Sequence, residues 1–161
     1  MMIQTTGNLV EMADNGTYDM IVHGCNCQCT MGSGIAAQLR KKWPEMYEAD
    51  NMTYDNDPAK LGTILPVVVK NKFGDALIVV NAYTQHYYGG DGGRYVNYAA
   101  VSECFRRLAE FPNFHQLSVG IPKIGAGLAG GDWNIIAEII NFHCGGGHVV
   151  LVNYEAAPEN S

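Results

Sequence analysis

Two spacings of apolar residues alternate along the chain, and they mark the expected strands and helices. Short apolar or alternating runs are typical of strands, and such runs cover residues 2–10 (interrupted at Gly7 and Asn8), 19–23, 62–70, 76–83, 117–121 and 148–154. Longer segments with apolar residues three or four positions apart predict helices at residues 35–43, 44–52, 95–111 and 132–142. Because the two kinds of element alternate, we expect an α/β fold with three layers, α/β/α, around a mixed, largely parallel central sheet of about six strands.

Three segments refine this expectation. Pro66 has no backbone N–H group, so the strand at residues 62–70 is the better candidate for an edge of the sheet. Residues 84–94 are rich in tyrosine and glycine, and we interpret them as a loop that either closes over a ligand or stays open. Residues 1–155 contain no linker and no internal repeat, so we expect a single domain, followed by a polar tail at residues 156–161.

The composition indicates a globular protein that binds a small molecule. Hydrophobic residues make up 47% of the chain and charged residues 16%, which excludes a disordered chain. The net charge of −6 opposes non-specific binding to nucleic acid, so a bound phosphate must be held mainly by backbone dipoles. No apolar run is long enough to span a membrane.

The five cysteines indicate reduced thiols rather than disulfides. Three of them, Cys25, Cys27 and Cys29, lie within five residues of each other, and no secretory signal precedes them. We therefore expect a cytoplasmic protein, and we expect it to be monomeric. The C-x-C-x-C spacing lacks nearby histidine pairs and does not match a zinc site, so we predict neither a metal nor another cofactor.

Two glycine-rich loops each join a strand to a helix. The first follows the strand at residues 19–23, passes through Asn26 and enters a helix through residues 32–34. The second loop, within residues 120–133, reaches the next helix at Asp132. Glycines at such junctions let backbone N–H groups approach an anion, and a helix N-terminus favours negative charge. The pair of loops predicts a ligand with two linked phosphates, held from both sides.

Other interpretations of these loops fit less well. GAGLAG, residues 125–130, matches the dinucleotide fingerprint G-x-G-x-x-G, and Glu155 stands near the end of the next strand, where a ribose-binding acid is expected. A nicotinamide oxidoreductase would need further strand–helix units after this one. A thiolate phosphatase would need an arginine at the far end of the first loop, but the residues six positions after the three cysteines are Met31, Ser33 and Ile35.

The two loops together carry a specific resemblance. HGCNCQCTMGSGIAAQL, residues 23–39, resembles the first ligand loop of macro domains, and GIPKIGAGLAGGDW, residues 120–133, resembles their second. TTGNLV, residues 5–10, resembles the segment after their first strand. The resemblance covers nearly the whole chain, in the same order. Within the family, the chain is most similar to the branch of ADP-ribose-1″-phosphate phosphatases and ADP-ribosyl-glutamate hydrolases.

The resemblance implies a set of ligand-binding residues. It places Asn8 at the adenine edge, where many macro domains have an aspartate, and Tyr154 beside the adenine ring. It places Asn26 at the distal ribose. The other ligand-binding residues that it implies lie in the two loops around the diphosphate and distal ribose: Gly32, Ser33, Gly34, Ile35, Gly125, Ala126, Gly127, Leu128 and Ala129.

Two departures from the family pattern bear on the mechanism. The lysine nucleophile of the ADP-ribosyl-glutamate hydrolases would fall near Ala82, and their partner aspartate is Ala129 here, so no lysyl intermediate is expected. The predicted catalytic residues are Asn26, which orients the distal ribose, and Asp132 or His23, which assists proton transfer. Each also has a structural interpretation: Asp132 as a helix cap, His23 as a buried strand residue and Asn26 as a turn residue.

The resemblance therefore implies a hydrolase that binds ADP-ribose. The expected reaction converts ADP-ribose 1″-phosphate to ADP-ribose and phosphate. Two alternatives stay open: a hydrolase of O-acyl-ADP-ribose or ADP-ribosyl esters, and a non-catalytic ADP-ribose reader. In each case the expected partner is a small-molecule ADP-ribose derivative, and neither nucleic acid nor a membrane is expected.

Overall fold

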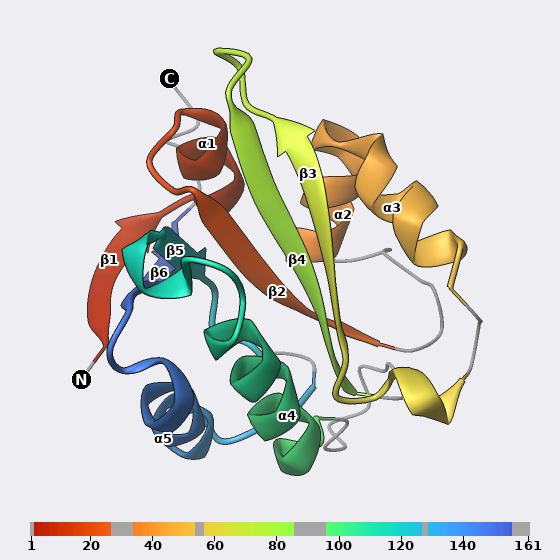
Figure 1. Ribbon diagram of the computed structural model, residues 1–161, viewed down its shortest axis with the longest axis vertical. Helices are drawn as coiled ribbons and strands as arrows, with labels where there is room; N and C mark the ends of the chain where they lie inside the picture. The colour runs from red at the N-terminus through yellow and green to blue at the C-terminus, as the bar shows by residue number, and fades with distance from the viewer. Residues whose placement is uncertain (1, 27–33, 54–56, 86–95, 127–128, 156–161) are drawn as a thin grey trace.

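Strands and helices alternate along the chain, as the sequence predicted (Figure 1). The computed structural model describes residues 2–26, 34–53, 57–85, 96–126 and 129–155, so the predicted tail and most of the predicted loop at residues 84–94 lie outside the described residues. The strands are β1 (Ile3–Gly7), β2 (Met20–Asn26), β3 (Ile64–Lys70), β4 (Ala76–Gln85), β5 (Ser118–Ile121) and β6 (His148–Tyr154). The helices are α1 (Leu9–Asp14), α2 (Gly34–Lys42), α3 (Pro44–Asn51), α4 (Tyr98–Ala109) and α5 (Trp133–Cys144), with short 3-10 helices η1 (Pro58–Lys60) and η2 (Phe114–Gln116).

The six strands in the described part of the chain form one mixed sheet in the order β1-β6-β5-β2-β4-β3. Every neighbouring pair is parallel except β3 and β4, which are antiparallel. β3, which contains Pro66, lies at an edge, because a proline cannot donate a hydrogen bond to a second neighbouring strand. The predicted sheet of about six largely parallel strands, with this strand at its edge, is confirmed.

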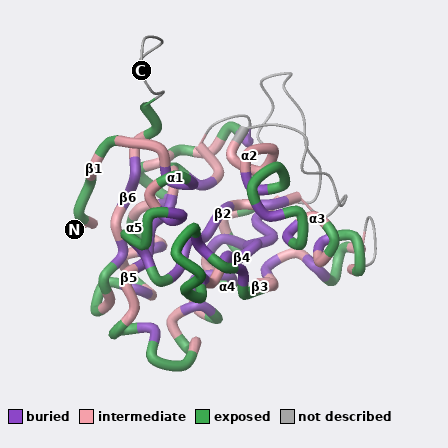
Figure 2. Tube along the Cα trace, turned by 90° about the horizontal axis from the view of Figure 1, so that it is seen from above, coloured by how far each residue is buried: buried purple, intermediate pink, exposed green. Residues whose placement is uncertain are grey.

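Helices cover both faces of the sheet, so the predicted three layers are confirmed. On one face, Val22 of β2 joins the core formed with α4 and α5, which includes Phe105 and Ile136. On the other face, Ile21 packs with residues of α1, α2 and α3, among them Met46. The buried residues of β2 and β4 run through the middle of the molecule (Figure 2), and burying one such side chain contributes about 1.5–3 kcal/mol. No helix in the described ranges is long and apolar enough to cross a membrane.

The predicted strand at residues 2–10 is wrong in its second half. Leu9 and Val10 do not extend β1 but begin α1, whose N-terminus is capped by Asn8. The Oδ1 atom of Asn8 accepts a hydrogen bond from the backbone N–H of Glu11 at 3.2 Å. Asparagine is a preferred N-cap residue. A short apolar run alone does not distinguish a buried strand from a short buried helix.

β2 and β5 lie side by side and parallel, yet the chain leaves them toward opposite faces of the sheet. After β2 it continues to α2, which packs on one face, and after β5 it continues to α5, which packs on the other. At such a reversal, the carboxyl ends of the two strands border a crevice, where ligands bind in open α/β sheets. The fold therefore directs attention to the carboxyl ends of β2 and β5.

Candidate functional site

The carboxyl ends of four parallel strands lie side by side, on the side of the sheet where these strands end. β1, β6, β5 and β2 are consecutive neighbours. Gly7 at the end of β1 is in register with Tyr154 at the end of β6, and Ile21 of β2 is in register with Gly120 of β5. The two glycine-rich loops therefore begin from neighbouring strands, as a shared ligand requires.

A pocket of about 370 Å³ opens at the carboxyl ends of these strands. It is lined mainly by apolar residues: Gly7, Asn8, Leu9, Val10, Ile35, Gln38, Pro122, Val152 and Tyr154. Three of these, Asn8, Ile35 and Tyr154, were predicted as ligand-binding residues, and the structure brings them together from the β1–α1 junction, α2 and β6. The Tyr154 side chain is 66% exposed, which leaves its ring accessible for stacking. The volume suits one small ligand or the base of a nucleotide.

The other lining residues of this pocket were not predicted from the sequence. Leu9 was not recognised as a pocket residue because the sequence pattern assigned it to a strand and not to α1. Gln38 follows Ile35 by three residues in α2, so helical spacing could have placed both on one face. Val152 precedes Tyr154 by two residues in β6 and shares its face of the sheet, which is a second signal that was present in the sequence.

In the described part of the second glycine-rich loop, the glycines are required by the local structure. Gly125 and Gly130 have φ angles of +76° and +72°, in the left-handed region that favours glycine. The N–H of Gly131 donates to the carbonyl oxygen of Gly125 at 2.7 Å. A Cβ atom at Gly125 or Gly131 would lie 2.7 or 2.6 Å from a methyl group of Val96. Close packing against Val96 thus accounts for these glycines independently of any ligand.

The other predicted loop residues differ in what the structure describes. Gly34 is the first residue of α2, and Ala126 lies half-buried in the turn after β5. Ala129 is 8% exposed, and its carbonyl oxygen accepts a hydrogen bond from the N–H of Val96 at 3.1 Å. Four residues implied by the resemblance lie outside the described residues: Gly32, Ser33, Gly127 and Leu128. The ligand-binding roles of all these residues stay predictions.

Asp132 caps helix α5. Its Oδ1 atom accepts a hydrogen bond from the backbone N–H of Asn134 at 2.9 Å. Its own N–H donates to the hydroxyl of Tyr98 in α4 at 3.0 Å, which ties the end of the second loop to a neighbouring helix. The side chain is exposed. The structural role that the sequence offered is therefore present, and the catalytic role stays a prediction.

His23 is a buried residue of the central strand β2. Its side chain is 1% exposed, and its Nε2 atom lies 2.5 Å from Oδ1 of Asn81 on the neighbouring strand β4. Because an amide oxygen only accepts, Nε2 carries the proton and donates it. Burial lowers the pKa of His23 to about 4, so the ring is neutral at pH 7. These observations favour the structural interpretation, and a catalytic role for His23 stays untested.

Asn26 ends β2 beside an irregularity in the strand pairing. β2 and β4 pair in step as far as Cys25 and Tyr83, and then Asn26 pairs with Gln85, so Thr84 has no counterpart on β2. Such bulges redirect neighbouring side chains and are frequent beside binding sites. Asn26 is half-buried at this point. Its predicted contact with the distal ribose stays a prediction.

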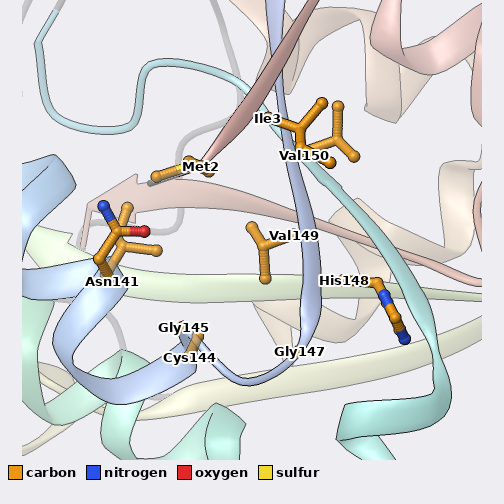
Figure 3. A pocket seen from close by; sticks show the side chains of 10 residues that line it. Met2, Ile3, Asn141, Cys144, Gly145, Gly147, His148, Val149 and Val150 are labelled. Carbon is orange, nitrogen blue, oxygen red and sulfur yellow. The ribbon is translucent and has the colours of Figure 1, made fainter.

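A second, smaller pocket of about 140 Å³ lies between the end of α5 and the starts of β1 and β6 (Figure 3). Ile3, Cys144 and His148 are among its lining residues. Because β1 and β6 run in parallel, this pocket lies at the amino-terminal ends of the strands, opposite the carboxyl ends where the ligand site is predicted. Its volume is below the range of about 300–1,000 Å³ that is typical of sites for ligands of nucleotide size.

Sequence comparisons identify relatives along most of the chain. The family described as the Macro domain matches residues 22–140. An uncharacterised 17.5 kDa protein of Enterobacteria phage T4 is 36% identical over 152 residues, covering 92% of this chain and 94% of that protein. The ADP-ribose 1″-phosphate phosphatase of Debaryomyces hansenii is 29% identical over 152 residues, covering 80% of this chain and 85% of that protein.

The fold agrees with these matches. The structure of the macrodomain of DarG from Mycobacterium tuberculosis superposes with a TM-score of 0.70 at 21% identity, covering 98% of this chain and 99% of that chain. The six-stranded sheet covered by helices on both faces is thus a macrodomain fold. Since the family match spans well over half of the sequence and the structure has the same fold, the chain belongs to the macro domain family.

Proposed function

We propose that this macro domain binds ADP-ribose and hydrolyses ADP-ribose 1″-phosphate to ADP-ribose and phosphate. The observation that carries the proposal is the pocket where Asn8, Ile35 and Tyr154 meet, at the carboxyl ends of parallel strands, where the family resemblance implied an adenine. The similarity to the ADP-ribose 1″-phosphate phosphatase of Debaryomyces hansenii supports the choice of substrate.

The proposed adenine contacts follow from the chemistry of the pocket. Tyr154 would stack on the ring, and the apolar side chains of Ile35 and Val152 would exclude water from it. The Oδ1 atom of Asn8 already accepts the hydrogen bond that caps α1, so its NH₂ group is the part that would donate to an adenine nitrogen. An aspartate at this position would instead accept from the adenine amino group. Asparagine therefore changes the direction of this hydrogen bond, not only its strength.

The diphosphate would lie in the crevice between β2 and β5. Ile35 lines the adenine pocket from the first turn of α2, so the N-terminus of that helix is close to the proposed route. Backbone N–H groups and the helix dipole favour a phosphate at such a terminus. The net charge of −6 leaves these dipoles as the main attraction for an anionic ligand. The compact turn containing Gly125 and Ala126 would close over the diphosphate from the other side.

In the proposed reaction, a water molecule attacks the phosphorus atom of the 1″-phosphate. The bond from phosphorus to the 1″ oxygen breaks, Asp132 accepts the proton of the attacking water, and the departing ribose oxygen takes a proton from a solvent water molecule. Asn26 would hold the distal ribose in place. We assign no proton transfer to His23, because its ring is buried and neutral. Ala82 is fully buried and carries no amine, so no lysine intermediate is included.

Two measurements test the proposal. Titration calorimetry with ADP-ribose tests binding, and phosphate release from ADP-ribose 1″-phosphate tests turnover. Asp132→Asn keeps an oxygen that can cap α5 but removes the carboxylate, whereas Asp132→Ala removes both. We expect Asp132→Asn to retain stability and lose most phosphate release, by about 10²-fold or more.

The outcomes separate the alternatives. Phosphate release no faster than in buffer, with turnover of O-acyl-ADP-ribose, would replace the phosphatase by an ester hydrolase. Binding of ADP-ribose without turnover of any 1″-substituted form would identify a reader. If Asp132→Asn retains full turnover, Asp132 acts only as a helix cap.

A further inference from the structure

A network of polar side chains, most of them buried, lies beside the end of β4. It consists of Asp50 from α3, Lys60 from η1, Tyr83 from β4 and Thr53, and we call it the Asp50 network. The Tyr83 hydroxyl donates to Oδ1 of Asp50 at 2.6 Å, and Nζ of Lys60 lies 3.7 Å from the same oxygen. Nζ also donates to the Thr53 hydroxyl at 2.6 Å and lies 4.4 Å from the centroid of the Tyr83 ring. Asp50 and Tyr83 are each 1% exposed, and Lys60 is 8% exposed.

Stability alone does not explain this network. Removing two charges from water costs several kcal/mol for each ion, and well-packed apolar residues in place of a buried ion pair are often as stable or more stable. A satisfied buried network instead holds its members in one arrangement, because breaking any contact leaves an unpaired polar group. Burial, with Cys25 and Asp50 nearby, raises the pKa of Tyr83, so its hydroxyl stays protonated and remains a donor. The network therefore fixes the position of the Tyr83 side chain.

Tyr83 in turn contacts the end of β2. It pairs with Cys25, the residue before Asn26, and the two side chains form a small buried cluster against Leu61 and Leu65. The pairing of β2 with β4 shifts by one residue immediately after this point. Because the regular ladder is interrupted there, side-chain packing between Cys25 and Tyr83 contributes to the position of the strand end.

We propose that Asp50, Lys60 and Tyr83 are positioning residues that fix the end of β2 so that Asn26 meets the distal ribose of ADP-ribose. This inference rests on the proposed function, and it adds a prediction about which part of the ligand is affected. The adenine pocket is formed by other elements, mainly the β1–α1 junction, α2 and β6. Loosening the Asp50 network should therefore weaken recognition of the distal ribose and leave recognition of ADP unchanged.

The test compares two ligands on one variant. Tyr83→Phe removes the hydroxyl that donates a hydrogen bond to Asp50 and leaves the ring in place. We expect its affinity for ADP to match that of the wild type and its affinity for ADP-ribose to fall by about three- to tenfold, the range that corresponds to the loss of one hydrogen bond. We expect kcat for phosphate release to fall while the affinity for ADP stays constant. Tyr18→Phe is the matched control, because Tyr18 is also buried but packs elsewhere, beside Gly120.

The same measurements can overturn the inference. A lower Tm with an unchanged ratio of ADP-ribose to ADP affinity, or an equal loss for both ligands, would leave the Asp50 network with a structural role only. If Tyr83→Phe does not fold, Thr53→Val allows the same comparison of ADP and ADP-ribose affinities. It removes the hydroxyl that accepts a hydrogen bond from Lys60, and Thr53 is only half-buried. Wild-type protein that binds neither nucleotide would reject the proposed function and this inference with it. Normal wild-type binding with an unaltered variant would reject the inference alone.

Discussion

Gly120 of β5 packs directly against the ring of Tyr18. A Cβ atom at position 120 would lie 2.8 Å from Cδ2 of Tyr18 and 2.7 Å from Cδ1 of Leu9, which is closer than carbon atoms approach in folded proteins. Leu9 belongs to α1 and lines the adenine pocket. The missing side chain at position 120 thus allows α1 to approach the sheet closely and places Leu9 at the pocket.

Gly120→Ala is therefore expected to destabilise the protein by overpacking. We expect a loss of about 1–3 kcal/mol in the free energy of unfolding, measured by urea denaturation. Gly146→Ala is the control, because the nearest atoms to its added Cβ lie 3.7 Å away on His115. Similar denaturation midpoints for the two variants would show that the core around Tyr18 adjusts without cost.

Asn8 has two separable contributions, one to the α1 cap and one to the proposed adenine contact. Asn8→Asp retains an oxygen that accepts from Glu11 and should keep its stability, whereas Asn8→Ala should lose about 1 kcal/mol. Asn8→Ala removes the amide donor and should bind ADP more weakly than the wild type, whereas Asn8→Asp can accept from the adenine amino group instead and should still bind ADP. Thermal denaturation and calorimetry with ADP check the two effects separately. Unchanged ADP affinity in Asn8→Ala would exclude Asn8 from adenine binding.

Tyr154 is expected to affect binding but not folding. Its side chain is 66% exposed, so Tyr154→Ala should change the free energy of unfolding by less than about 0.5 kcal/mol. Loss of an aromatic stacking partner should weaken ADP binding by about tenfold, while Tyr154→Phe retains the ring and should bind nearly as the wild type does. Equal ADP affinity in the alanine and phenylalanine variants, measured by calorimetry, would contradict stacking.

The buried His23 ring predicts a loss of stability in acid. Its pKa falls from an ordinary value of 6.5 to about 4 in the folded protein, so between these pH values the unfolded chain binds a proton that the folded chain does not. Stability therefore falls as the pH falls through this window, by about 3 kcal/mol in total for this group. Denaturant unfolding at several pH values should show this dependence in the wild type and a flatter profile in His23→Gln. Parallel profiles for both proteins would exclude His23 as the source.

The local features of this fold could be predicted from the sequence. The spacing of apolar residues predicted the strands and most helices, and Pro66 predicted an edge strand, because both signals depend on neighbouring residues alone. The cap at Asp132 was predicted for the same reason. The paired glycine-rich motifs indicated the family. The strand predicted at residues 9–10 was wrong, because the 6-residue helix α1 is too short to leave a recognisable periodic pattern.

What the tertiary structure decided is which distant residues meet. Asn8, Ile35 and Tyr154 share a pocket because β1, β6, β5 and β2 are neighbours in an order that differs from their order in the chain. Asp50 and Tyr83 are 33 residues apart in the chain and meet only because α3 packs against this face of the sheet. Strand order and register depend on long-range packing that local spacing does not encode. The sequence by itself therefore determined the elements and the loops, and the packed sheet determined which side chains those loops and elements bring together.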